Sequence, residues 1–111
     1  MERLEEIKSI GWFHLLILKA IISEPTRSMS TKQIADRLES YFKFYGIPFA
    51  RGSRRVFFMQ KVGLLVRLGL LEVTKGSINI YSLKPEYASE VMMLVAGYFG
   101  LVDKAKSLER D

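Results

Sequence analysis

The first part of the chain has the pattern of a buried helix followed by a polar connection. Residues 11–23 are almost wholly apolar and end just before Pro25, which predicts a helix covered on most of its sides. His14 lies inside this apolar stretch. We expect it to be a core or interface histidine with satisfied hydrogen bonds, with a pH switch as the alternative. Residues 24–29 are predicted to form a polar connection.

A second helix is predicted to begin after Ser30 and to end at Gly46. Ser30 and Gln33 have the spacing of a capping box, in which each side chain bonds to the backbone N–H of the other residue. Gly46 occupies the position of a C-terminal cap. Apolar residues at spacings of four, three and four mark one buried stripe: Ile34, Leu38, Tyr41 and Tyr45.

A third helix and a β-hairpin follow. The helix is predicted over residues 53–68, and Gly69 lies where a left-handed C-terminal cap belongs. Two strand-like stretches come next, at 70–74 and 78–83. They are joined by a turn at 75–77, whose glycine can supply a positive φ.

A long last helix is predicted over residues 86–108, after Pro85 in a favourable first-turn position. Apolar side chains cover nearly its whole circumference, so we expect one side to pack on its own domain and another on a partner. Residues 1–9 are charged and are predicted either to extend the first helix or to form a short helical arm. The pattern as a whole predicts one domain over residues 1–111, of the α+β class and mostly α.

Positive charge is concentrated in the middle of the chain. The net charge of the protein is +5, but residues 27–84 carry eleven Lys and Arg against three acids, whereas the remaining residues carry six against nine. The middle therefore has a charge of +8 and the rest a charge of −3. Such an asymmetry favours a polyanionic partner, because basic residues that neutralise phosphates release condensed counterions.

The order helix, helix, helix, hairpin, helix resembles that of the winged-helix transcription regulators of the MarR, PadR and ArsR kind. Three stretches carry the resemblance: TKQIADRL at 31–38, VGLLVRLGLLE at 62–72 and KGSINIYSLKPEY at 75–87. They are similar to the second helix, to the end of the third helix with the first wing strand, and to the wing with the start of the final helix. The resemblance implies a winged helix-turn-helix with three helices, a hairpin wing and a long C-terminal helix.

The resemblance also implies how double-stranded DNA is bound: helix 53–68 enters the major groove and the wing at 75–77 touches the backbone. Helical spacing gives the third helix a core face and an opposite face that holds Gln60, Gly63 and Arg67. Gln60 can pair bidentately with adenine. Gly63 would let the third helix approach a surface closely. Alternatively, the glycine is merely tolerated there or is needed for packing inside the protein. The predicted DNA-binding residues are Arg27, Lys32, Arg51, Ser53, Arg54, Arg55, Gln60, Lys61 and Lys75.

The all-round apolar last helix predicts a homodimer. Two copies would present their third helices to successive major grooves, about 34 Å apart, of a pseudo-palindromic site. The resemblance implies that such a dimer regulates transcription. The residues predicted to form the dimer interface are Tyr87, Met92, Met93, Ala96 and Phe99.

Enzymatic, metal-binding and membrane functions are not supported by the residues. Cysteine is absent and His14 is the only histidine, so thiolate and multi-histidine metal sites are not available within one chain. Neither a nucleophile elbow nor a phosphate-binding glycine loop is present, and no cofactor is expected. No stretch has the length of a membrane span, and we expect a cytoplasmic protein. No effector site is recognisable.

Two other functions remain open. Winged helices also connect proteins in larger assemblies, and the apolar last helix would then meet a different chain. A sequence-neutral architectural or RNA-binding protein would use the same basic residues. Such binding would show little preference among nucleic-acid sequences.

Overall fold

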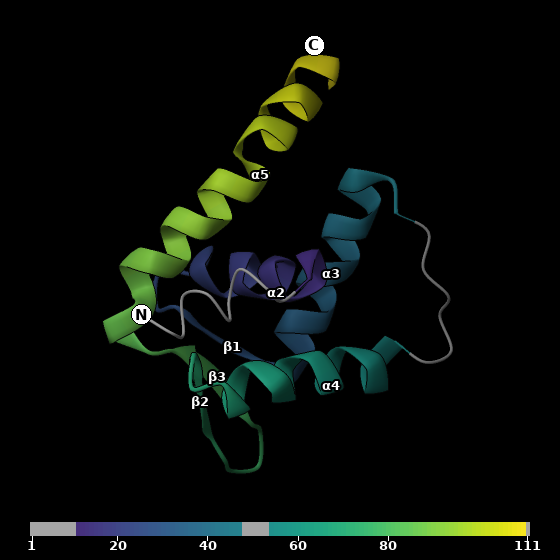
Figure 1. Cartoon of the computed structure of the whole chain (residues 1–111). Helices are drawn as coiled ribbons and strands as arrows, with labels where there is room; N and C mark the ends of the chain where they lie inside the picture. The colour runs from purple at the N-terminus through teal and green to yellow at the C-terminus, as the bar shows by residue number, and fades with distance from the viewer. Residues whose placement is uncertain (1–10, 48–53, 111) are drawn as a thin grey trace.

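A computed structural model describes residues 11–47 and 54–110, with side chains for 11–47, 59–100, 103 and 104. The predicted arm at 1–9 lies outside the described residues. Along the chain the elements are α2 (Trp12–Ile22), β1 (Ser28–Ser30), α3 (Thr31–Tyr45), α4 (Arg54–Arg67), β2 (Leu71–Thr74), β3 (Ile80–Leu83), the 3-10 helix η1 (Pro85–Tyr87) and α5 (Ala88–Arg110). The fold is α+β and mostly helical, as predicted, with a small antiparallel sheet (Figure 1).

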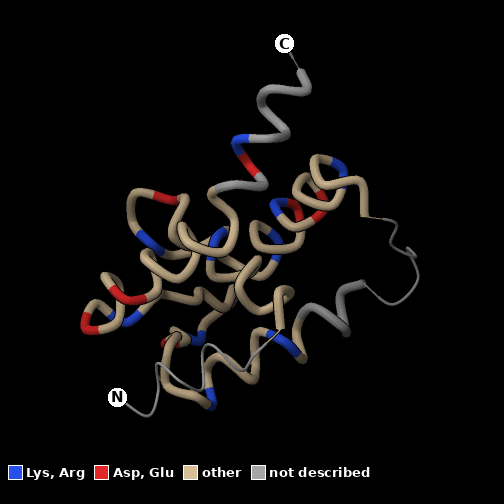
Figure 2. The backbone as a smooth tube through the Cα atoms, turned by 45° about the horizontal axis from the view of Figure 1, so that its top comes forward, with Lys and Arg blue, Asp and Glu red and all other residues tan. Residues whose placement is uncertain are grey.

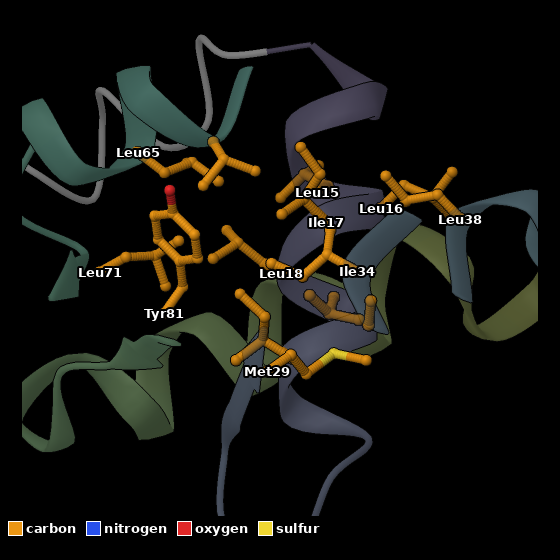
Figure 3. Packing of buried hydrophobic residues seen from close by; sticks show 14 of the residues in the cluster. Leu15, Leu16, Ile17, Leu18, Met29, Ile34, Leu38, Leu65, Leu71 and Tyr81 are labelled. Atoms are coloured by element: carbon orange, nitrogen blue, oxygen red, sulfur yellow. The ribbon is translucent and has the colours of Figure 1, made fainter. Parts of the chain in front are cut away.

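Helix α2 lies at the centre of the molecule. Eight of its 11 residues are buried, and α3, α4, α5 and the sheet all contact it. Figure 3 shows Leu16 directed toward Leu38 of α3, and Leu18 directed toward Tyr81 of β3. The prediction of a helix covered on most sides is confirmed, because neighbours surround α2 on several faces.

Local signals set the ends of α3 as the sequence predicts. The Ser30 hydroxyl accepts a hydrogen bond from the Gln33 backbone N–H at 3.2 Å, and the Gln33 side chain accepts one from the Ser30 N–H at 2.8 Å. Gly46 ends the helix at a left-handed φ of 69°, which glycine adopts without a Cβ clash. On the predicted stripe, Ile34 and Leu38 are buried, whereas the two tyrosines are half-buried.

The sheet contains a strand that the sequence did not reveal. Residues 24–29 were expected to form only a polar connection, but Ser28–Ser30 pair with β3, so the strand order is β1-β3-β2. The hydroxyls of Ser28 and Ser82 lie 2.8 Å apart across this pair, and Met29 is buried in the core. Three residues are too few to show an alternating pattern, and the strand depends on the free edge that β3 offers.

The hairpin differs from the prediction in its turn. Strands β2 and β3 are joined by residues 75–79, two more than expected, and Gly76 does not have a positive φ. A five-residue loop can reverse the chain without the primed two-residue turn that would require one. Gly69 does have the predicted left-handed conformation, with a φ of 81°.

The inner side of α5 packs on its own domain. Val91, Val95 and Phe99, spaced four residues apart, are buried, and the Phe99 ring stacks on the Tyr45 ring at 5.8 Å. Phe99, which was predicted to lie in a dimer interface, therefore packs in the core of its own chain and offers little area to a second copy. Tyr87 is half-buried against the same core, so it also offers little area to a second copy.

A polar cluster joins α5 to α2 and α3. The Lys19 ammonium lies 2.8 Å from the Asp103 carboxylate and 4.9 Å from the ring centres of Tyr41, Tyr45 and Phe99. The Tyr45 hydroxyl donates a hydrogen bond to Asp103. Burial, followed by this hydrogen bond, raises the pKa of Tyr45 well above its ordinary value, so the phenol stays neutral and remains a donor.

Candidate nucleic-acid interface

Helix α4 has the two faces that the sequence predicts. Val62 and Leu65 are fully buried against the core, and Gln60 and Arg67 are exposed. Gly63 lies between these two polar residues and is half-buried. The exposed face therefore combines an amide, a residue with no side chain and a guanidinium.

The hairpin loop lies on the same side of the molecule as α4. Strand β2 contacts α4, and the Leu70 N–H donates to the carbonyl of Leu65 at 3.1 Å. In Figure 1 the loop and α4 are both on the lower side, whereas the C-terminal half of α5 leaves the domain on the upper side. Residues 75–78 of the loop are exposed. Helix α4 and the loop thus form one candidate binding surface, separate from α5.

The electrostatic character of this surface is positive. Helix α4 contains four basic residues and no acid, and its described part carries blue but no red in Figure 2. Arg67 and Lys75 make no ion pair with any described residue, whereas the fold uses the pairs Lys19–Asp103 and Arg37–Glu24. The hairpin carries one acid, the exposed Glu72 on β2, three residues before Lys75. The unpaired cations are thus available to an anionic ligand.

Two predicted contacts outside α4 and the loop lie at opposite ends of the sheet. Lys32 is exposed in the first turn of α3, two residues after Ser30. Ser30 pairs with Ile80, the first residue after the hairpin loop. Arg27 lies at the other end of β1, where its Nη1 donates to the Met92 sulfur at 3.0 Å. The structure brings Lys32 to the loop side of the sheet and holds Arg27 against α5.

Several predicted contacts are only partly described. Arg51 and Ser53 lie outside the described residues, and of Arg54 and Arg55 only the position in the first turn of α4 is known. Lys61 is half-buried and acts electrostatically on His14, so it lies at the edge of the candidate surface.

Arg67 is a candidate contact missing from the predicted set. It lies seven residues after Gln60 and four after Gly63, which places it on the same helical face. The signal was present in the sequence, since helical spacing alone puts Arg67 opposite the core. Its exposure and its lack of an acidic partner among the described residues make it a stronger candidate than Lys61.

His14 is buried in α2 and has no hydrogen-bond partner among the described residues. Its side chain is 7% exposed, and neither ring nitrogen is bonded to a described residue. The hydrogen bonds expected for this histidine are therefore not formed with any described residue. Burial, and secondarily the positive charge of Lys61, lowers the pKa of His14 below its ordinary value of 6.5.

Comparison with known proteins assigns no family. The chain matches none of the models of known protein families that were searched, and the search of curated proteins gave no significant relative. None of the described helices is both long and apolar enough to cross a membrane. The described His, Asp and Glu side chains do not gather into groups of three or more that could hold a metal ion.

The buried His14 predicts a dependence of stability on pH. The pKa of His14 is lower in the folded state than in the unfolded state, so the unfolded state binds more protons as the pH falls below about 6.5. The free energy of unfolding should therefore decrease with falling pH, by at most about 1.4 kcal/mol per pH unit from this group. His14→Leu removes the titration and two unsatisfied polar atoms, and should stabilise the protein by about 1–3 kcal/mol at neutral pH.

Urea unfolding of the two proteins at about pH 7.5 and about pH 5 measures both effects. Carboxylates titrate equally in wild type and variant, so the difference between the two proteins isolates His14. An equal loss of stability in both proteins on acidification would show that His14 does not titrate in this range.

Proposed function

We propose that this protein binds double-stranded DNA as a winged-helix domain, with α4 in the major groove and the 75–79 loop on the backbone. The observation that carries the proposal is an acid-free basic helix whose exposed polar face lies on the same side as an exposed basic hairpin loop. The order α2, β1, α3, α4, β2, β3, α5 is compatible with a winged-helix layout. A B-DNA major groove about 12 Å wide admits a helix of this kind.

Each exposed group on the proposed surface has a chemical role. The Gln60 amide can pair with the N6 and N7 atoms of adenine, and the Arg67 guanidinium with O6 and N7 of guanine. Lys75 and Lys32, both exposed, would contact phosphate oxygens, and such contacts position a domain without reading sequence. Arg54 and Arg55, in the first turn of α4, would add positive charge where helix N–H groups already favour phosphate.

We further propose that the protein acts as a homodimeric, cytoplasmic regulator of transcription. The outer side of α5 exposes apolar and small residues, and Met93 has 73% of its surface accessible. Ala96, Gly97 and Gly100 are also exposed, which would allow a second helix to approach closely. Because this side of α5 faces away from α4 and the loop, a dimer formed there would leave both DNA-binding surfaces free (Figure 1).

The exposed apolar surface of α5 as a whole favours a second candidate function, a connector between different proteins. Tyr98 is 51% exposed and, with Met93, gives this helix apolar surface beyond what the fold buries. A connector does not need the exposed cations Arg67 and Lys75 of α4 and the loop. DNA binding therefore separates the two candidates.

Replacing the exposed cations of the proposed surface should weaken DNA binding. The double variant Arg67→Ala/Lys75→Ala removes two contacts with the polyanion, so the salt dependence of log K should decrease by up to about 1.8. Fluorescence anisotropy with a labelled random duplex, at several salt concentrations, measures the slope. The double variant Lys43→Ala/Lys104→Ala is a matched control, because it removes the same charge from exposed positions on α3 and α5.

The control should bind nearly as tightly as wild type. Equal losses in the two double variants would mean that net charge, and not this surface, determines binding. A folded wild type that fails to bind at low salt would contradict the proposed function and favour the connector.

A charge on the outer side of α5 should separate the proposed dimer. Met93→Glu would bury an unpaired carboxylate in the interface, so light scattering at micromolar concentration should find a monomer where wild type is a dimer. Ser40→Glu, on the exposed side of α3, is the control and should remain a dimer. A monomeric wild type under the same conditions would rule out the dimer.

A further inference from the structure

Gly63 is a glycine in the interior of a helix. It is the tenth of the 14 residues of α4 and does not have a positive φ. At such a position glycine destabilises the helix relative to alanine, because it loses more backbone freedom on folding. Backbone conformation therefore does not explain the glycine at position 63.

The described part of the fold does not require glycine at this position. A Cβ built on Gly63 would meet one described atom outside the local helix backbone, Nη1 of Arg67, at 3.9 Å. This is an ordinary van der Waals distance, and the atom is the far end of a flexible side chain. Gly46 and Gly69 differ, because their positive φ values favour glycine whatever the space around them.

The surroundings of Gly63 are those of a binding surface. Gln60 precedes it by three residues and Arg67 follows it by four, and both side chains are exposed on the same face of α4. Arg67 makes no ion pair with a described residue. Gly63 thus lies between an exposed amide and an exposed guanidinium on one face of α4, and the Arg67 Nη1 that lies nearest to it belongs to a flexible side chain that can move when a ligand binds.

We propose that Gly63 is the point where α4 most closely approaches the floor of the DNA major groove. A helix with its side chains is about 10–12 Å wide, close to the width of the groove, so one methyl group limits how deeply it can enter. Without a side chain at 63, the edge of a base pair can contact the helix backbone, and Gln60 and Arg67 reach the base edges beside it. This inference rests on the proposed function and adds Gly63, as the point of closest approach, to the base-reading residues Gln60 and Arg67.

Gly63→Ala tests the proposal, because it should affect folding and binding in opposite directions. The melting temperature should rise by about 2–6 °C, since the methyl group fits the fold and improves the helix. Affinity for a specific duplex should fall by about tenfold or more, since the methyl group holds α4 away from the bases.

The probe is the duplex that wild type enriches from a random-sequence library, and binding is measured by fluorescence anisotropy at one salt concentration. Ser40→Ala, a helix-favouring change on the exposed side of α3, is the control. It should bind the probe within about twofold of wild type, because Ser40 lies outside the proposed surface.

The outcomes separate this inference from the proposed function. If Gly63→Ala is stabilised and binds the probe as tightly as wild type, the inference is wrong and the proposed function stands. A lower melting temperature of Gly63→Ala would also overturn it, because glycine would then serve packing inside the domain. If wild type enriches no duplex, the sequence-specific function and the inference fail together.

Discussion

Burial of α2 is the constraint on which the rest of the structure depends. A helix that is apolar on all sides is stable only at the centre of a fold, and each fully buried Leu or Ile contributes about 1.5–3 kcal/mol. Helices α3, α4 and α5 and the sheet supply the surfaces that cover it. Lys19, its one charged residue, is accommodated because it reaches Asp103 and three aromatic rings at the edge of the core. The buried His14 has no hydrogen-bond partner among the described residues.

The central helix also separates two surfaces of different chemistry. Helix α4 and the 75–79 loop present Arg67 and Lys75, which form no ion pair with a described residue, and the Gln60 amide, whereas the outer side of α5 presents methionine and small residues. In Figure 1, α4 and the loop lie on the lower side of the molecule, and α5 extends to its upper side. In the proposed function the first binds DNA and the second a copy of the chain, so neither interaction obstructs the other.

The features predicted correctly from sequence are those that neighbouring residues determine. The capping box at Ser30, the left-handed glycines at 46 and 69 and the two faces of α4 follow from spacing alone. The errors concern contacts between distant segments. Strand β1 depends on the edge of β3, and Phe99 is buried because Tyr45, far from it in sequence, lies opposite. The assignment of a binding surface to α4 stays a prediction; within it, Arg67 lies on the exposed face of α4 beside Gln60, whereas Arg27 lies against α5, away from the hairpin loop.

The central claim is that DNA contacts α4 and the hairpin loop, and an NMR titration of the labelled protein with a duplex tests it most directly. The account predicts that the backbone amide signals of Gln60, Gly63, Arg67 and Lys75 shift, while those on the outer side of α5, such as Met93 and Gly97, stay in place. Shifts concentrated on α5, or no shifts at low salt, would contradict it.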